Sequence, residues 1–196
     1  MSLLQAASEQ TSSLAVEQIC AAFAQFKVAP ARPHEVAEAR GFAARLIGGE
    51  IVSAETLSRV HRRTGVSLFL ARDQGELTGV LAFLPLNARG RQALWSDTFS
   101  AIEPCAAHIA TQGETPAAIY NWGIAASRHR AVKRLIDGYE LMRREVVPGA
   151  AFFGRPVTEA GRRLMIDRLK FKSVPRSRTG LVWIEPIDQL TAAAAA

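Results

Sequence analysis

Residues 117–136 read AAIYNWGIAASRHRAVKRLI, an apolar run that changes into an arginine-rich helical pattern. The first half is rich in strand formers, and the second half continues at helical spacing through Val132, Leu135, Ile136 and Tyr139. A strand that leads into a helix leaves several backbone N–H groups without partners, and the helix dipole favours an anion there. The stretch therefore predicts a site for a phosphorylated cofactor at residues 124–131.

The net charge of +6 is distributed unevenly along the chain. Residues 1–125 contain 10 Lys/Arg against 11 Asp/Glu, whereas residues 126–180 contain 14 against 5. Positive charge thus gathers around the predicted phosphate site, which indicates an anionic ligand. The plainer alternative is that many of these arginines only solvate exposed helix faces.

Length and composition predict one soluble globular domain. A chain of 196 residues with 48% hydrophobic and 21% charged residues is long enough for one substantial core. No apolar run reaches the roughly 18 residues of a membrane span, and no basic residue precedes Lys27 as in a secretory signal. We therefore expect a cytoplasmic protein without membrane contact. Cys20 and Cys105 lack metal-ligand spacing, which predicts two buried free thiols and no metal site.

Periodicity and turn residues predict a mixed order of helices and strands. Helices are expected at 13–26, from 33 to 47, 53–63, 89–95, 104–110, from 128 onward and 158–169; strands are expected at 26–29, 66–72, 77–84, 119–126, 150–153, 171–174 and 181–185. This order predicts an α+β fold with a mostly antiparallel sheet of six to seven strands flanked by helices. We divide the chain into an N-terminal extension with an amphipathic helix (1–25), a domain (26–186) with an irregular insertion (87–115), and a tail (187–196).

Three local sequences stand out against this order. FKVAPARPHE at 26–35 is similar to an opening strand and first-helix entry, and LKFKSV at 169–174 stands where a known family writes Leu-Gly-Phe. RHRAVK at 128–133 is in register with that family's cofactor loop, Arg/Gln-x-x-Gly-x-Gly/Ala. Over residues 26–185 the chain resembles the GCN5-related N-acetyltransferase (GNAT) superfamily.

The resemblance implies a GNAT-like fold and an N-acyltransferase that uses acetyl-coenzyme A or another acyl-coenzyme A. It implies that backbone groups of Ile124 and Ala126 pair with the pantetheine arm of the cofactor. It also implies a cradle for the pyrophosphate at Arg128, His129, Arg130, Ala131 and Lys133.

The chain departs from the family pattern at three positions. Ala131 stands in place of the central glycine, and Lys133 replaces the final small residue. A glycine there would let a pyrophosphate approach the backbone closely. Lys133 could neutralise a phosphate or fill the space that the cofactor needs. The family's frequent catalytic tyrosine falls at about Ile166, so an acid or base must come from elsewhere.

Acyl transfer to an amine needs a polarised thioester carbonyl and a base for the amine proton. We select Glu114, Tyr120 and Asn121 as candidate catalytic residues. Glu114 lies just before the central strand, and Tyr120 and Asn121 lie within it on opposite faces. Further candidates lie in the insertion, at Asp97, Glu103 and His108. For each of these a solvated loop residue is the plainer interpretation, and aromatic core packing is the plainer one for Tyr120.

The insertion 87–115 is hypothesised to shape the pocket for the acceptor, because long irregular segments in compact domains often serve as lids or binding loops. The acceptor would be a small-molecule or peptide amine, and the chain could form a homodimer. Two alternatives remain. One is a catalytically silent GNAT-fold binding or regulatory protein. The other is a nucleic-acid binder, which lacks a recognisable motif and interleaved aromatic residues.

Overall fold

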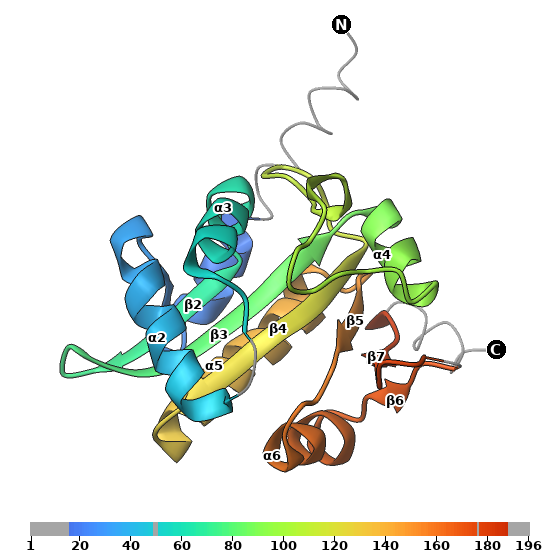
Figure 1. The fold of residues 1–196 in the computed structure, drawn as a ribbon. Coiled ribbons are helices and arrows are strands. Elements are labelled where there is room, and N and C mark those ends of the chain that lie inside the picture. Colours follow the sequence, from blue (N-terminus) through green and yellow to red (C-terminus); the bar gives the residue numbers. More distant parts are fainter. Residues whose placement is uncertain (1–15, 49–50, 176, 188–196) are drawn as a thin grey trace, which may run out of the picture.

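The computed structural model describes residues 16–48, 51–175 and 177–187 (Figure 1). The strands are β1 (Val28–Pro30), β2 (Leu68–Asp73), β3 (Glu76–Leu86), β4 (Ala118–Ala126), β5 (Ala151–Gly154), β6 (Lys172–Ser173) and β7 (Val182–Ile184). The helices are α2 (Val36–Ile47), α3 (Ala54–Thr64), α4 (Ala88–Trp95), α5 (His129–Leu141) and α6 (Glu159–Arg162), with shorter or wider turns at η1 (Pro33–Glu35), η2 (Ala106–His108), η3 (Met142–Val146) and η4 (Arg163–Arg168). Residues 16–24 form one more helix. Among the described helices, none has both the length and the apolar character of a membrane span.

The seven strands form one sheet in the order β1-β2-β3-β4-β5-β7-β6. Every neighbouring pair is antiparallel except β4 and β5, which are parallel. The parallel pair is possible because α5 crosses over between the two strands. The predicted mostly antiparallel sheet of six to seven strands, flanked by helices, is confirmed, and so is the order of elements expected from the sequence.

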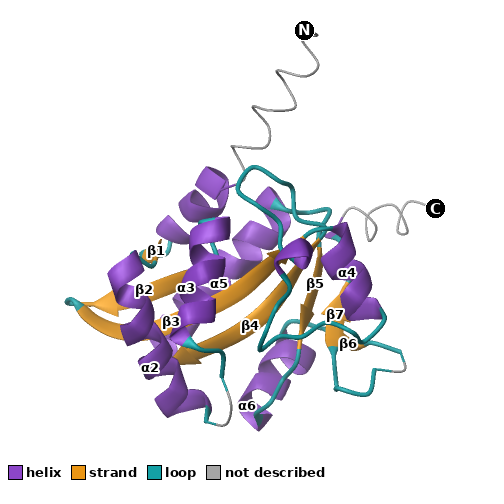
Figure 2. Ribbon diagram, turned by 45° about the horizontal axis from the view of Figure 1, so that its top comes forward, coloured by secondary structure: helices purple, strands orange, loops and turns teal. Residues whose placement is uncertain are grey.

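Helices cover both faces of the sheet (Figure 2). Helix α5, η3 and the helix at 16–24 pack on one face, and α2, α3 and α4 pack on the other. Strand β3 is apolar at nearly every position because both of its faces are covered. Its alternate residues enter different clusters: Leu81 and Phe83 contact the α5 side, whereas Val80 and Leu84 contact the other side.

An aromatic stack fixes the helix at 16–24 onto the sheet. The ring of Phe23 lies 4.1 Å from the ring of Phe69, and the ring of Phe83 lies 5.7 Å from that of Phe69. Gly138 of α5 makes room for this stack, since a Cβ there would come within 2.5 Å of the Phe23 ring. The described part of the N-terminal helix is therefore part of the main core; the remaining residues of the extension lie outside the described residues.

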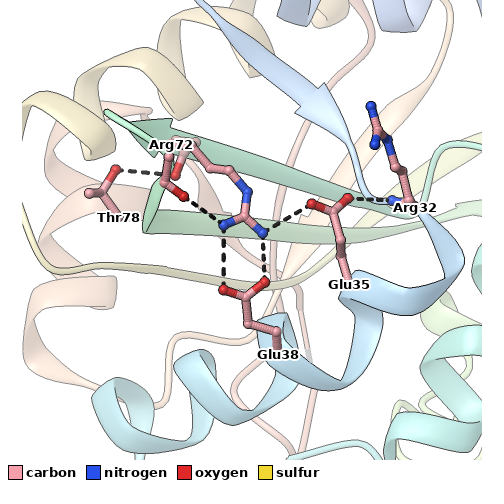
Figure 3. Close-up of polar contacts among 7 residues, drawn as sticks. Arg32, Glu35, Glu38, Arg72 and Thr78 are labelled. Atoms are coloured by element: carbon pink, nitrogen blue, oxygen red, sulfur yellow. Dashed lines mark hydrogen bonds and ion pairs between the residues drawn. The ribbon is translucent and has the colours of Figure 1, made fainter.

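Polar contacts tie the first helices to the hairpin of β2 and β3 (Figure 3). The guanidinium of Arg72 lies between Glu35 and Glu38, with nitrogen–oxygen distances of 3.0 and 2.6 Å. Glu35 also accepts a 2.7 Å hydrogen bond from the amide of Arg32. The pKa of Glu35 is lowered, first by this backbone bond; burial opposes the shift, and the hydrogen bond and charge of Arg72 lower the pKa further. Lys27, Arg32, Leu70 and Arg72 are among the residues that line a hollow of about 350 Å³ beside this network.

The predicted helix starts are confirmed by their caps. Ser53 Oγ accepts from the amide of Thr56, and Thr158 Oγ1 accepts from the amide of Gly161. Gly65 ends α3 with a left-handed φ of 74°. The helix expected at 158–169 begins as α6 and continues as the π-type turn η4.

The insertion 87–115 is more ordered than its sequence predicts. Leu94 of α4 and Ile109 are buried in the core, and Ile109 forms a bridge with Leu86 of β3. Cys105, at the start of η2, is exposed, and Cys20 is half-buried, where burial raises the pKa of its thiol. The expectation of two buried thiols is thus wrong for Cys105, which lies in a surface loop and not on an apolar helix or strand face.

Candidate functional site

Strands β4 and β5 pair over four residues only. Ala118–Asn121 of β4 lie beside Ala151–Gly154 of β5, and the pairing ends at Asn121 and Gly154, which we call the branch point (Figure 2). At the same place β4 has a bulge: Asn121 pairs with Phe83 and Gly123 with Ala82, so Trp122 is an extra residue. From Trp122 to Ala126, β4 therefore has β3 on one side and no strand on the other.

The backbone polarity of this unpaired edge follows from the register. Ser127 donates its N–H to the carbonyl of Thr78 at 3.0 Å, and the register runs back through Ala126–Gly79 and Ala125–Val80. Hydrogen-bonded and non-bonded pairs alternate in an antiparallel ladder. Ala125 is therefore bonded to β3, whereas Ile124 and Ala126 turn their N–H and C=O groups toward the free edge. These are the two residues that the resemblance assigns to the pantetheine arm.

The free edge continues into the N-terminus of α5. The N–H groups of Arg128, His129 and Arg130 have no hydrogen-bond partner among the described residues, and we call these three amides the amide cradle. The amide of Ala131 is not part of it, because it donates to the carbonyl of Arg128 at 3.0 Å. The expectation of a continuous run of free amides at 124–131 is therefore wrong at residues 125, 127 and 131, and it holds at the alternate edge positions and the first turn.

Most cations around the amide cradle already have carboxylate partners. Arg128 lies 2.9 Å from Glu76, Lys133 2.5 Å from Asp137, and Arg134 3.1 Å from Asp73. Arg134 is mostly buried and also donates to the carbonyl of Arg72, so it fastens α5 to the hairpin. Among the described residues, Arg130 has no carboxylate partner. The net positive charge at the amide cradle is thus smaller than the excess of 14 Lys/Arg over 5 Asp/Glu in residues 126–180 suggests.

Two of the three departures from the family pattern, Ala131 and Lys133, have side chains that point away from the amide cradle. Ala131 is fully buried, and its methyl group faces Gly79 of β3, where an added Cβ would lie only 3.2 Å away. Lys133 extends along the helix surface to Asp137, and 63% of its side chain is exposed. Neither side chain occupies the space in front of the three free amides.

The three candidate catalytic residues occupy different places. Glu114 lies in the turn before β4 and accepts hydrogen bonds from the amide and hydroxyl of Thr111. Strand β4 rises by about 3.3 Å per residue, so Glu114 is about 25 Å or more along the strand from the amide cradle, at the opposite end of β4 (Figure 1). Tyr120 and Asn121, in contrast, lie at the branch point.

Tyr120 and Asn121 face opposite sides of the sheet. Tyr120 is 4% exposed and packs in the cluster on the α4 side, 5.5 Å from the ring of Phe99. Burial raises its pKa, and the charge of Arg155 opposes the rise. Asn121 has a buried Oδ1 without a partner, and its Cβ lies near Gly154. An unpaired buried carbonyl is costly, which is a reason to expect a ligand or water at this oxygen.

The insertion reaches the branch point on the face of Tyr120. Trp122 Nε1 donates to the carbonyl of Ala101 at 2.7 Å. Asp97 accepts from the hydroxyl of Thr179 at 2.8 Å and from the amide of Arg178 at 3.1 Å, which connects the insertion to the loop before β7. His108 lies beside the end of β3, where its carbonyl accepts from the amide of Asn87 at 3.1 Å, and its ring lies 6.2 Å from that of Phe99 between centroids. The amide of Glu103 is bonded to Ser100 within an exposed turn.

Arg155 is a residue that we did not select from the sequence. It directly follows Gly154, the last residue of β5, and its Nε is buried without a hydrogen-bond partner. The sequence does show an arginine directly after a short apolar strand. It does not show that this arginine lies at the branch point, because that depends on where β5 ends. Among the described residues, no group of three or more His, Cys, Asp or Glu side chains could hold a metal ion.

Comparison with known proteins finds similarity in solved structures only. No protein-family model and no curated protein sequence matches the chain. One similar structure is described as a GphF GNAT-like decarboxylase in complex with isobutyryl-CoA; it is 14% identical, with 70% of each chain covered and a TM-score of 0.46. Another is described as histone acetyltransferase HPA2 and related acetyltransferase from Corynebacterium glutamicum ATCC 13032; it is 18% identical, with 81% of this chain and 95% of that chain covered and a TM-score of 0.47.

Proposed function

We propose that this protein is a divergent member of the GNAT superfamily that binds an acyl-coenzyme A along the free edge of β4 and transfers the acyl group to an amine. The observation that carries the proposal is the succession of unpaired backbone groups from Ile124 and Ala126 to the amide cradle. A coenzyme A molecule offers the matching chemistry: an extended arm with amides for a strand edge, followed by a diphosphate for a helix N-terminus.

The amide cradle would hold the diphosphate in this proposal. Three converging N–H groups at the start of a 13-residue helix supply donors and a positive dipole end. Arg130 and His129 are exposed beside them and could add charge, and Arg128 could exchange its exposed partner Glu76 for a phosphate. The edge groups of Ile124 and Ala126 would pair with the pantetheine amides.

The thioester would then lie near the branch point. During transfer, the amine nitrogen forms a bond to the thioester carbon, the carbon–sulfur bond breaks, the amine loses a proton and the thiolate gains one. Tyr120 is a candidate for the donor to the thiolate, because its hydroxyl group is protonated at neutral pH and the residue lies at the branch point. Asn121 would bind the substrate through its unpaired side-chain carbonyl.

A second candidate function is a catalytically silent binding protein of the same fold. It is favoured by the acids: the described carboxyl groups with displaced pKa values, Glu35, Asp97 and Glu159, are all displaced downward, which makes them poorer bases. Glu114 also lies at the far end of β4. Without a base for the amine proton, the protein would bind the ligand and no transfer would occur.

Calorimetry with coenzyme A and acetyl-coenzyme A tests the binding step. We expect Arg130→Glu to raise the dissociation constant about tenfold or more, because it places a negative charge beside the diphosphate. Arg59→Glu is the matched control, since Arg59 is an exposed arginine on α3, on the other face of the sheet, and the change in net charge is the same. No measurable binding, or equal losses in both variants, would overturn the proposal.

Release of free thiol in the presence of an amine panel separates the two candidate functions. Turnover with any amine supports the transferase. Binding of acetyl-coenzyme A without thiol release favours the silent binding protein.

A further inference from the structure

Arg155 is a cation without a counterion at the end of β5. It follows Gly154, which pairs with Asn121 at the branch point, and the residue is half-buried. Its Nε is buried with no hydrogen-bond partner, and no ion pair or hydrogen bond joins its guanidinium to another described residue. The buried Nε thus lacks a hydrogen bond and the charge lacks a counterion, and an anionic ligand at this place would satisfy both.

Asp97, an acid whose pKa the charge of Arg155 lowers, does not neutralise Arg155. Asp97 uses one carboxylate oxygen for the hydroxyl of Thr179 and the other for the amide of Arg178. Its pKa is lowered first by the bond from Thr179, then by that from Arg178 and by the charges of Arg155 and Arg178. Asp97 and Arg155 therefore influence each other electrostatically but make no ion pair within 4.0 Å. The planar donor set of the guanidinium is left for another carboxylate.

A second half-buried arginine with unbonded buried nitrogens shows that this situation is not general among the described residues. Arg143 also has nitrogens that are buried without a hydrogen bond, but its Nε lies 3.5 Å from the carboxylate of Glu140. Its charge is thus matched inside the fold. Arg155 differs because it is unmatched and directly follows the carboxyl end of β5, where the parallel pairing of β4 and β5 ends. Ligands commonly bind at the carboxyl ends of strands in sheets with parallel strands.

We propose that Arg155 binds a carboxylate carried by the ligand at the branch point, so that the substrate is an acid as well as an acyl donor or acceptor. This inference rests on the proposed function. The carboxylate could belong to the acceptor, an amino acid or related amine, or to the acyl chain of the donor. In both cases an arginine can take the two oxygens with two parallel N–H···O bonds.

Calorimetry with matched ligand pairs tests the proposal and separates the two sources. The donor arm compares succinyl-coenzyme A with butyryl-coenzyme A, which has the same chain length without the carboxylate. The acceptor arm compares a panel of L-amino acids with their amides, titrated into protein saturated with coenzyme A. We expect one arm to prefer the carboxylate by about tenfold or more, and we expect that preference to disappear in Arg155→Gln.

Two further variants serve as controls. Arg155→Lys keeps the charge but loses the paired donors, so it should retain only part of the preference. Arg168→Gln removes an exposed arginine of η4 and should leave the preference unchanged. Thermal unfolding and the affinity for unacylated coenzyme A report whether Arg155→Gln is folded.

The outcomes distinguish this inference from the proposed function. If coenzyme A binds but neither arm prefers the carboxylate, or the preference survives in Arg155→Gln, the inference is overturned and the proposed function stands. If coenzyme A itself does not bind the wild-type protein, both are overturned.

Discussion

Residues 118–121 of β4 have a strand on each side, whereas residues 122–126 have β3 on one side only. The first half is buried almost completely, and the second half is mostly half-buried although its residues are as apolar. The difference arises outside β4, because β5 ends after four residues at Gly154. One strand is therefore core in its first half and exposes backbone donors and acceptors in its second half, which is where a ligand could pair with it.

The largest expected effect separates two isoleucines of this strand. Ile119 is fully buried against the α5 side, so Ile119→Ala should lower the free energy of unfolding by about 2–5 kcal/mol. Ile124 is half-buried on the same face, and Ile124→Ala should lower it by about 1 kcal/mol. Denaturant unfolding measures both. Equal losses would show that the second half is as well packed as the first.

Gly79 holds the second half close to α5. A Cβ at Gly79 would lie 2.9 Å from the end of the Leu135 side chain, 3.2 Å from the Ala131 methyl and 3.3 Å from the Ala126 methyl, and the two methyl groups cannot rotate away. Gly79→Ala should therefore displace the start of α5, lower the free energy of unfolding by about 1–3 kcal/mol and weaken coenzyme A binding.

Gly154→Ala provides the contrast for Gly79→Ala. The added methyl group at Gly154 would meet the end of the flexible Met165 side chain, which can move. Gly154→Ala should therefore lower the free energy of unfolding less than Gly79→Ala does. The reverse order, in a comparison by denaturant unfolding, would contradict the close packing of α5 on β3.

The pH dependence of stability should come from the covered half. His61 of α3 is buried beside Val60, which packs in the same cluster as Tyr120, and its Nε2 lies 2.8 Å from the carbonyl of Ala31. Burial lowers the pKa of His61, and the bond to Ala31 opposes this. The unfolded state therefore binds more protons once the pH falls below about 6.5.

The free energy of unfolding should decrease as the pH falls from 7.5 to 5.5, by at most about 1.4 kcal/mol per pH unit from this one group. His61→Gln should remove that slope, whereas His129→Gln, at the exposed start of α5, should leave it unchanged. Denaturant unfolding at several pH values provides the measurement. An unchanged slope in His61→Gln would assign the pH dependence to other groups.

Asn121 marks the boundary between the two halves. Its Oδ1 is buried without a partner, so Asn121→Leu should raise the free energy of unfolding by about 1 kcal/mol. The same variant should weaken substrate binding or turnover if the carbonyl contacts a ligand. A loss of stability instead would indicate that the amide is already satisfied by a bound water molecule.

Local sequence predicts the elements because local chemistry makes them. The helices expected from residues 53 and 158 begin there, capped by Ser53 and Thr158, and the hairpin of β2 and β3 forms around Gly75. The apolar pattern of β3 fits a strand that is covered on both faces. These features depend on residues within a few positions of each other.

The site could be predicted only in part, because it depends on long-range pairing. The alternate positions Ile124 and Ala126 follow from strand geometry, but the length of β5 and the bulge at Trp122 are set by packing elsewhere. The insertion was expected to be irregular, yet Leu94 and Ile109 are buried because β3 and β4 provide them with a surface. Arg155 gains its significance only from the branch point.

Lys133 gives the smallest and last test of the comparison. Its ammonium group pairs with Asp137 one turn along α5, and exposed pairs of this kind contribute about 0.3–0.5 kcal/mol to stability. Lys133→Ala should therefore change the free energy of unfolding by no more than that, and it should change the affinity for coenzyme A less than Arg130→Glu does. If the lysine filled the space in front of the amide cradle, its removal would tighten binding, because the ligand would no longer have to displace it. A clear gain in affinity, measured by calorimetry at two salt concentrations, would contradict the open cradle at the end of the unpaired half of β4.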